Sequence, residues 1–437
     1  MRGEPGCRRR IGGNVSADRF IPSRAAMNPA YCELMLSSES RPPSASSSQA
    51  PAHRDLLFSA LVASDVPQDH RLLRFQSPPT CRSTAISLRG IHHPTPHRLN
   101  PDPTPRRHIP QTPTRILDAP DLRDDYYLNL LAWGSTNLLA VALDKRVFLY
   151  HVDTGAVSAL DAAVASAQDY VTSVAWLGDG RTLAIGTADA DLQIWDATTC
   201  KCVRRVRSHE ERVGALAWNP TLNALASGSR DTKIVQHDLK APQSTAVATL
   251  RGHVQEICGL AWSPDGKTLA SGGNDNRLSL WDGAMATPRL TLLQHNAAVK
   301  ALAWCPWERH LLASGGGTAD RCIKLWQSSS GTMQQSVHTG SQVCGLLWSP
   351  HEKELLSSHG FSQNELCLWS YPRMSRIKEF TGHTARVLHM AMSPDGASVV
   401  SAAADETLRF WNVFASTKSS AQAARFGSQF QSIWGIR

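Results

Sequence analysis

WSPDGKTLASGGNDNRLSLWD, residues 262–282, is one copy of a unit that recurs along most of this 437-residue chain. It holds a Pro-Asp-Gly turn, a run of small residues, a second turn with Asp275, and an apolar run that closes on Trp281-Asp282. Short apolar runs separated by such turn residues are typical of consecutive antiparallel strands. The stretch therefore predicts neighbouring strands of one small sheet.

The opening Trp of this unit recurs every 42 to 44 residues, and its closing residue recurs every 42 to 45. The opening series is Trp176, Trp218, Trp262, Trp304, Trp348 and then Met392, and the closing series is Trp195, His237, Trp281, Trp326, Trp369 and Trp411. Upstream histidines recur as well, at His209, His253, His295 and His383. An earlier unit runs from Trp133 to Tyr150, with Tyr at the closing place. A period of about 40–45 residues with these markers is typical of WD-repeat β-propellers.

We therefore predict an all-β fold, a seven-bladed WD-repeat β-propeller over residues 115–412. A four-stranded unit cannot bury both of its faces alone, so the units pack side by side around an axis, and closing the ring removes exposed edges. We expect Asp275, His253 and Trp281 to share a hydrogen-bond network within their blade, which is a structural role and not a catalytic one.

Residues 1–114 and 413–437 lie outside the repeats. The first segment is rich in Pro, Ser and Arg and poor in aromatic residues, so we predict that it is a disordered tail. Residues 413–437 are predicted to form a short C-terminal tail after the propeller. Residues 1–115 hold 16 Arg and 8 acidic residues, whereas the remainder holds 29 basic and 29 acidic residues. The net charge of +8 therefore belongs to the tail, and a neutral propeller argues against a nucleic-acid partner.

Composition and motifs also bear on chemistry and location. The ten cysteines have no zinc-ligand spacing, which predicts no metal and a reducing compartment, nucleus or cytoplasm. No run approaches the roughly 18 apolar residues of a membrane span. Gly266-Lys267-Thr268 ends like a phosphate-binding loop, but Ala261 stands where that loop needs its first Gly. We predict a protein that is not an enzyme and has no cofactor.

Three segments outside the generic repeat carry a resemblance. The segment DRFIPSR (18–24) resembles the C-box of the Fizzy-type WD-repeat coactivators of the anaphase-promoting complex, the chain ends in that family's Ile-Arg, and RRHIPQTPTRILDAPDLRDDYYLNLLAW (106–133) resembles its lead into blade one. The resemblance covers the propeller and both ends. It implies a coactivator that brings substrates to this ubiquitin ligase, promoting ubiquitination of mitotic regulators, with ligase contacts at Asp18, Arg19, Phe20, Ile21, Pro22, Arg24, Ile436 and Arg437.

The same resemblance implies two sites for short degradation motifs (degrons) on the propeller. For a Lys-Glu-Asn degron the matching residues are Asp125, Tyr126, Asn274, Asn276, Thr318, Gln342 and Arg386, and for an Arg-x-x-Leu degron they are Asp118 and Glu406, at the edge between blades one and seven. The implied partners are ligase subunits, degron-bearing substrates such as cyclins, and spindle-checkpoint proteins.

Two branches of the family fit, and the tail favours the mitotic Fizzy branch. Ala25-Ala26-Met27, the run IPQTP (109–113) and Arg71, Leu72, Leu73, Arg74 and Phe75, which resemble a checkpoint-protein binding motif, support it. Three Thr-Pro-x-Arg sites, at Thr95, Thr104 and Thr112, have the form that cyclin-dependent kinases prefer. The alternatives are a Fizzy-related coactivator of late mitosis and the resting phase, a general WD-repeat scaffold, and a decayed paralogue. Residues 37–68 match nothing in the family and leave open whether checkpoint binding is retained.

Overall fold

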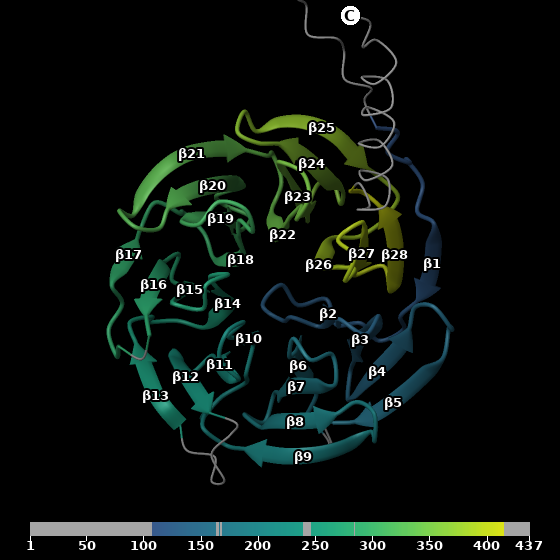
Figure 1. Cartoon of the computed structure of the whole chain (residues 1–437), viewed down its shortest axis with the longest axis vertical. Helices are drawn as coiled ribbons and strands as arrows, with labels where there is room; N and C mark the ends of the chain where they lie inside the picture. Colours follow the sequence, from purple (N-terminus) through teal and green to yellow (C-terminus); the bar gives the residue numbers. More distant parts are fainter. Residues whose placement is uncertain (1–106, 163–165, 167, 239–245, 284, 415–437) are drawn as a thin grey trace, which may run out of the picture. The chain divides into compact units, whose positions relative to one another are not determined.

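The computed structural model describes residues 107–162, 166, 168–238, 246–283 and 285–414. Within these ranges the chain forms 28 strands in seven four-stranded antiparallel sheets, which are arranged as blades around an axis (Figure 1). The predicted seven-bladed, all-β propeller is thereby confirmed. The described part of the chain contains no helix that is long and apolar enough to cross a membrane.

Blades one to four follow the chain from the axis outward, each as a simple meander. Blade one has β2 (Leu131–Trp133), β3 (Leu138–Leu143), β4 (Arg146–His151) and β5 (Val157–Asp161). Blade two has β6 (Val171–Trp176), β7 (Thr182–Thr187), β8 (Leu192–Asp196) and β9 (Lys201–Val206). Blade three has β10 (Ala215–Trp218), β11 (Ala224–Gly228), β12 (Lys233–Asp238) and β13 (Ala246–Arg251). Blade four has β14 (Ile257–Trp262), β15 (Thr268–Gly273), β16 (Leu278–Asp282) and β17 (Leu290–Leu292).

Blade seven differs because it combines the two ends of the repeat region. Blade five has β18 (Val299–Trp304), β19 (Leu311–Gly316), β20 (Cys322–Gln327) and β21 (Thr332–His338), and blade six has β22 (Val343–Trp348), β23 (Glu354–His359), β24 (Leu366–Ser370) and β25 (Ser375–Phe380). Blade seven takes β26 (Val387–Met392), β27 (Ser398–Ala403) and β28 (Thr407–Asn412) from the end of the repeats and its outer strand, β1 (Arg115–Asp118), from their beginning. Pairing of β1 with β28 closes the ring.

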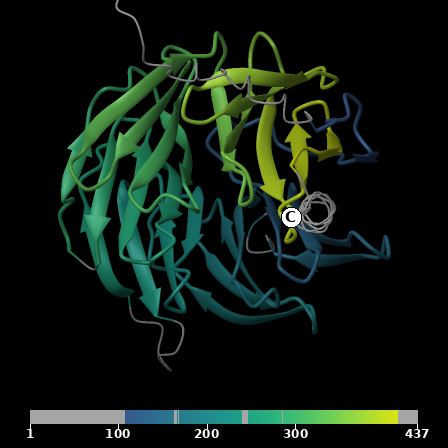
Figure 2. The same cartoon turned by 45° about the horizontal axis from the view of Figure 1, so that its top comes forward.

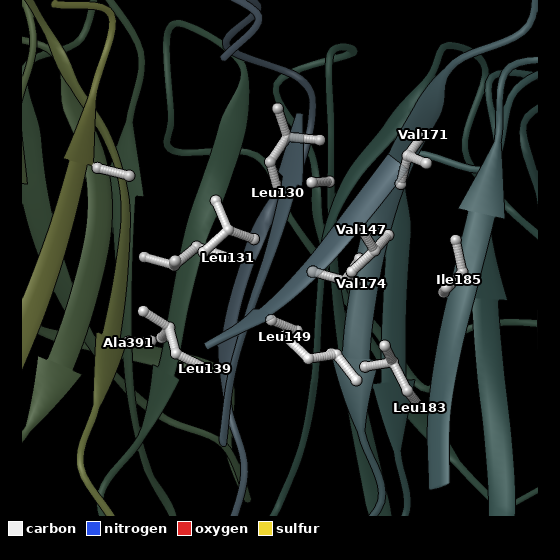
Figure 3. Packing of buried hydrophobic residues seen from close by; sticks show 14 of the residues in the cluster. Leu130, Leu131, Leu139, Val147, Leu149, Val171, Val174, Leu183, Ile185 and Ala391 are labelled. Atoms are coloured by element: carbon white, nitrogen blue, oxygen red, sulfur yellow. The ribbon is translucent and has the colours of Figure 1, made fainter. Parts of the chain in front are cut away.

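The small-residue strands are explained by how closely neighbouring blades approach. A Cβ atom added to Gly272 in β15 would stand 2.1 Å from the carbonyl oxygen of Val299, in the first strand of the next blade. Branched aliphatic side chains fill the space between blades; Figure 3 shows Leu139, Leu149 and Leu183 among the buried residues of blades one and two. The tilted view in Figure 2 shows the blades standing around the axis.

Four members of the opening Trp series join their blade to the one before it, whereas the buried indole N–H of Trp262 has no partner among the described residues. In each of the four, the indole N–H donates to a backbone carbonyl of the preceding blade, at 3.0 to 3.2 Å: Trp176 to Ala132, Trp218 to Ala175, Trp304 to Ala261 and Trp348 to Ala303. At the junction of blades seven and one the bond is replaced, because Trp133 donates to Asn137 of its own turn at 2.9 Å. The 42- to 44-residue period is thus a period of inter-blade bonds.

The predicted network within blade four is confirmed, with Ser271 as its missing member. The Trp281 indole N–H donates to the Ser271 hydroxyl oxygen (2.8 Å), and that hydroxyl lies 2.7 Å from Nε2 of His253. The other ring nitrogen, Nδ1, is 3.1 Å from the Asp275 carboxylate. Burial alone would raise the pKa of Asp275, but the hydrogen bond from His253 holds that pKa below its ordinary value. Because a carboxylate only accepts, Nδ1 carries the proton and Nε2 accepts from Ser271.

The same network recurs in other blades. Blades five and seven repeat it with His295, Ser314 and Trp326, and with His383, Ser401 and Trp411. In blade three, His237 takes the place of the closing Trp and lies 2.9 Å from the Ser227 hydroxyl. Burial lowers the pKa of His237 to about 4, so this ring is neutral at physiological pH.

Two short segments that the sequence assigned to the tails pack on the propeller. Arg107 bonds the Glu354 carboxylate (2.6 Å) and the carbonyl oxygen of Val413 (2.7 Å), and Ile109 packs against the core of blades six and seven. Val413 and Phe414 are buried in the same core. These apolar residues are too few to be recognised in a Pro-rich sequence, yet each packs in or against the core of blades six and seven.

The shared serine gives a test of the network. We expect Ser271→Ala to lower the free energy of unfolding by about 2 kcal/mol, because it leaves a buried indole N–H and a buried imidazole nitrogen without partners. Denaturation of the full chain by guanidinium chloride measures the change.

Ser279 provides a matched control, because it faces Ser271 on the paired strand, is equally buried, and has a hydroxyl without a hydrogen-bond partner among the described residues. Ser279→Ala should change stability by less than about 0.5 kcal/mol. Equal losses in the two variants would contradict the assigned network.

Candidate functional site

One residue in each blade stands six places before the opening Trp, or before Met392, close ahead of the first strand. Around the ring these residues are Tyr127, Tyr170, Arg212, Glu256, Ala298, Gln342 and Arg386, and we call them the axial ring. Neighbouring strands are antiparallel, so these positions lie at the same end of the blades as the turns between second and third strands. The axial ring therefore gathers charged, aromatic and amide groups on one loop face.

The connection between β1 and β2, residues 119–130, runs from the outer edge of blade seven to the axis, and we call it the strap. Figure 1 shows it reaching the centre of the ring ahead of β2. The guanidinium carbon of Arg123 lies 3.7 Å from the centroid of the Tyr170 ring. The next two strap residues, Asp124 and Asp125, bind the axial-ring arginines Arg386 and Arg212.

Further strap side chains are anchored to backbone on the far side of the axis. The Tyr126 hydroxyl donates to the carbonyl oxygen of Val343 at 3.1 Å, and burial raises the pKa of this phenol well above its ordinary value. The Asn129 amide donates to the carbonyl oxygens of Gly214 (2.8 Å) and Cys258 (3.1 Å). The strap thus bonds to blades three, four and six, and its backbone is fixed at the axis.

Arg212 is the centre of a charge network on the loop face. It forms two hydrogen bonds with the Glu256 carboxylate, at 2.7 and 2.8 Å, and one with Asp125 at 2.8 Å. Burial by itself lowers the pKa of Arg212, but the bonds to Glu256 outweigh it and raise that pKa above its usual range. Two carboxylates therefore share one permanent cation, and Asp125 is held in a fixed orientation.

The blade-four turn supplies amide groups beside this network. The Tyr127 hydroxyl donates to Oδ1 of Asn274 at 2.8 Å, and the Asn274 amide donates to Gln255 at 2.7 Å. Asn276 lies two residues further on, in the left-handed conformation (φ 63°) that Asn tolerates well. In the corresponding turn of blade five, Thr318 is exposed.

Arg386 and Gln342 occupy the blade-seven and blade-six places of the axial ring. Arg386 bonds the Asp124 carboxylate through Nε and the Asp124 carbonyl oxygen through Nη2 (2.9 Å), and its guanidinium lies 5.4 Å from the centroid of the exposed Phe361 ring. The Gln342 side chain is only 5% exposed, and its Oε1 has no hydrogen-bond partner among the described residues. A buried acceptor of this kind is satisfied by an ordered water, or by a ligand group once the side chain turns outward.

Beneath the strap, the first strands of the blades enclose an axial cavity of about 250 Å³. Lys300 lines it and donates to the carbonyl oxygen of Leu388 at 3.1 Å, and burial lowers the pKa of this amine to about 8. His389 also lines the cavity, and burial lowers the pKa of its imidazole well below the ordinary value. A long lysine side chain of a ligand would meet a cation here, so it is better received on the loop face above.

The second predicted site lies on the outer half of blade seven. Asp118 ends β1 opposite Thr407, and the Ala119 N–H donates to the carbonyl oxygen of Glu406 at 2.7 Å. Both carboxylates are exposed, and neither has an ion-pair partner within the described ranges. The sequence placed this pair between blades one and seven; the structure puts both residues in blade seven, because β1 is its outer strand.

The remaining predicted positions fall mostly on the tails. The C-box residues Asp18–Arg24, the motif Arg71–Phe75, Thr95, Thr104 and Ile436-Arg437 lie outside the described residues. Thr112 lies within them and is exposed, in the segment 107–114 that runs along blades six and seven.

Several members of the loop face are not among the binding residues expected from the sequence. Arg212 and Glu256 precede their strands at the same place as Gln342 and Arg386, so the repeat itself carried the signal. Asp124 had no recognisable signal in the sequence, because an exposed Asp beside another Asp is common in loops. Among the residues that the structure describes, no group of three or more His, Cys, Asp or Glu side chains is arranged to hold a metal ion.

Comparisons with known proteins agree with this arrangement. A family model described as the CDC20/Fizzy WD40 domain matches residues 117–411. "Cell division cycle 20.1, cofactor of APC complex" from Arabidopsis thaliana is 46% identical, over 93% of this chain and 89% of that protein. "Protein FIZZY-RELATED 2" from the same plant is 44% identical, over 95% and 87%. The two branches are thus almost equally similar.

A solved structure gives the same result for the fold. A chain of "Crystal Structure of Mitotic Checkpoint Complex" is 43% identical and superposes with a TM-score of 0.68, covering 77% of this chain and 100% of that one. The region matched by the family model, residues 117–411, contains all of the axial ring and the strap. The family model, the relatives and the solved structure therefore agree that this chain belongs to the CDC20/Fizzy family of WD40 proteins.

Proposed function

We propose that this protein is a substrate-binding coactivator of the anaphase-promoting complex, a ubiquitin ligase, and that its propeller holds degrons on the loop face. The observation that carries the proposal is the axial ring together with the strap. They concentrate two arginines, a buried amide and the carboxylates of Glu256, Asp124 and Asp125 at one end of the axis. The names of the relatives, which are cofactors of that complex, support the choice of ligase. The protein binds its partners and leaves the chemistry to the ligase.

The loop face fits a Lys-Glu-Asn degron group by group. Arg386 is the cation for the degron Glu, and a guanidinium binds a carboxylate through two parallel hydrogen bonds. The Gln342 carbonyl and the amides of Asn274 and Asn276 suit the degron Asn, whose side chain both donates and accepts. Tyr126, Asp125 and Thr318 border the same surface. The strap carboxylates suit the degron Lys.

The acidic pair on blade seven fits an Arg-x-x-Leu degron, such as those of cyclins. Asp118 and Glu406 offer two exposed carboxylates to the degron Arg. The site is on the outer half of the blade, whereas the axial ring is at the axis, so one substrate with two degrons can occupy both. Two weak contacts on one body reinforce each other through effective concentration.

The tails are proposed to dock the propeller on the ligase. The C-box offers two guanidinia and an Ile-Pro pair, and Ile436-Arg437 offers an apolar side chain and a guanidinium. Residues 71–75 are the proposed contact for a spindle-checkpoint protein, in line with the similarity to a chain of a mitotic checkpoint complex. We place the protein in nucleus and cytoplasm, with Thr95, Thr104 and Thr112 as kinase sites. The tail motifs favour the mitotic branch over the Fizzy-related one.

Charge reversal at the axial ring tests the first degron site. Arg386→Glu should reduce the affinity for a Lys-Glu-Asn peptide by about tenfold or more, because it sets a like charge against the degron Glu. An Arg-x-x-Leu peptide should bind as before, and fluorescence anisotropy measures both.

Arg230→Glu is the matched control, since Arg230 is an exposed arginine in a turn of the same loop face and pairs with Glu211. It should leave both affinities unchanged. Loss of both peptides in Arg386→Glu would indicate a damaged fold, and loss of neither would reject the site.

Neutralising the blade-seven pair tests the second degron site. Asp118→Asn with Glu406→Gln should weaken an Arg-x-x-Leu peptide by about tenfold or more, because the loss of even one charge-assisted bond costs about 1.5–3 kcal/mol. The Lys-Glu-Asn peptide should keep its affinity in the same titration. Unchanged binding of the Arg-x-x-Leu peptide would mean that its site lies elsewhere.

Ligase docking is tested on the tails. Arg19→Ala with Arg24→Ala, or removal of Ile436-Arg437, should each reduce copurification with the ligase several-fold, and the combination should abolish it, because the two contacts act together. Thermal melting should be unchanged in each variant. Full copurification of the combined variant would refute tail docking.

A further inference from the structure

Arg386, the proposed receptor for the degron Glu, is already paired in the free chain. Its Nε and Nη2 both bond Asp124, one through the carboxylate and one through the carbonyl oxygen (2.9 Å). The Arg386 side chain is 17% exposed and the Asp124 side chain 51% exposed, so the carboxylate forms the solvent side of the pair. A degron carboxylate that approaches Arg386 from solvent meets Asp124 first.

We propose that Asp124 is a specificity-determining residue that exchanges partners with the degron: the degron Glu takes over Arg386, and Asp124 turns to the degron Lys. This inference rests on the proposed function and adds a residue to it. Before binding there is one ion pair within the protein, and afterwards there are two between protein and degron. The exchange links recognition of the Lys to recognition of the Glu.

The neighbouring carboxylate cannot perform this exchange. Asp125 is fixed by Arg212 through one oxygen (2.8 Å) and by the backbone N–H of Tyr127 through the other (2.9 Å), and its side chain is 29% exposed. Releasing it would also disturb the bidentate bond between Arg212 and Glu256. Asp124 has Arg386 as its only ion-pair partner among the described residues, so it can move without breaking the network.

Arg386 keeps its position when Asp124 leaves, because a second contact holds it. Its guanidinium lies over the face of Phe361, at 5.4 Å from the ring centroid, and this ring is itself exposed. A cation over an aromatic face is attracted by the ring quadrupole. The Asp124 carbonyl oxygen belongs to the anchored strap and can remain bonded. The cation is therefore presented to the degron in a fixed orientation.

The exchange predicts which peptides are rejected. A peptide with Glu but without Lys must displace Asp124 and leaves that carboxylate without a partner, so it binds poorly. A peptide with Lys but without Glu leaves the Asp124–Arg386 pair intact and gains little. Only a peptide with both charges gives new partners to both Arg386 and Asp124. Removal of the Asp124 carboxylate should therefore increase the affinity of a peptide without Lys more than that of the complete degron.

The test is a double-mutant cycle between Asp124 and the degron Lys, with the full-length chain and fluorescent peptides. In the unchanged protein, replacing the degron Lys by Ala should weaken binding about tenfold, a size typical of a coupled charge pair. In Asp124→Asn the same replacement should cost less than about twofold. The Lys-less peptide should bind Asp124→Asn about fivefold more tightly than it binds the unchanged protein.

Asp144→Asn is the matched control, because it removes one exposed carboxylate that is ion-paired with Arg123. It should leave the tenfold Lys effect in place. The inference would be overturned if replacing the degron Lys by Ala weakened binding equally in the unchanged and Asp124→Asn proteins. It would also be overturned if that replacement lost its effect in Asp125→Asn but not in Asp124→Asn.

The inference and the proposed function fail in different ways. If Arg386→Glu abolishes binding of the Lys-Glu-Asn peptide but the cycle shows no coupling, the degron site stands and the exchange falls. If that peptide binds the unchanged protein no better than a scrambled peptide, the proposed function falls and the exchange with it.

Discussion

The pairing of β1 with β28 is the contact on which the rest of this molecule depends. Four residues, Arg115 to Asp118, supply the outer strand of a blade whose other strands lie almost 300 residues later, and so close the ring. The same pairing sets Asp118 beside Glu406. Because the chain must then return from the outer edge of blade seven to the first strand of blade one, it also directs the strap across the loop face to the axis.

The strap places paired charges across the loop face. Its consecutive residues Arg123, Asp124 and Asp125 contact the axial-ring residues of three different blades, and Tyr126 bonds a fourth. Repeated blades alone would present seven separate loops. With the strap in place, Asp124 pairs with Arg386 and Asp125 pairs with Arg212. The side-chain oxygen of Gln342 has no hydrogen-bond partner among the described residues. Such a surface is preorganised for a short peptide that carries both charges, since binding requires the exchange of one ion pair while the strap backbone stays in place.

Structural and functional signals in this repeat are carried by different positions. The opening Trp, the closing Trp, the histidines and the buried serines are mostly held within or between blades by hydrogen bonds that recur from blade to blade. The axial ring lies just outside the strands, where the core imposes no residue type, and there the blades differ: aromatic, cationic, anionic, small and amide residues follow one another. That division explains why the strongest motifs of the sequence have no catalytic or binding role in this proposal.

The sequence by itself determined the number of blades, the hydrogen-bond network around Asp275, His253 and Trp281, and the common loop level of Gln342 and Arg386, because a repeat spacing transfers local geometry from blade to blade. It did not determine that residues 107–114 pack on the propeller, that Ser271 links the network, or that Arg386 binds Asp124 while Asp125 binds Arg212. Asp124 and Arg386 are 262 residues apart, and the choice between two adjacent carboxylates was made by the path of the strap. Only the closed ring brings the competing partners within reach of each other, so only the tertiary structure decides which pairs form.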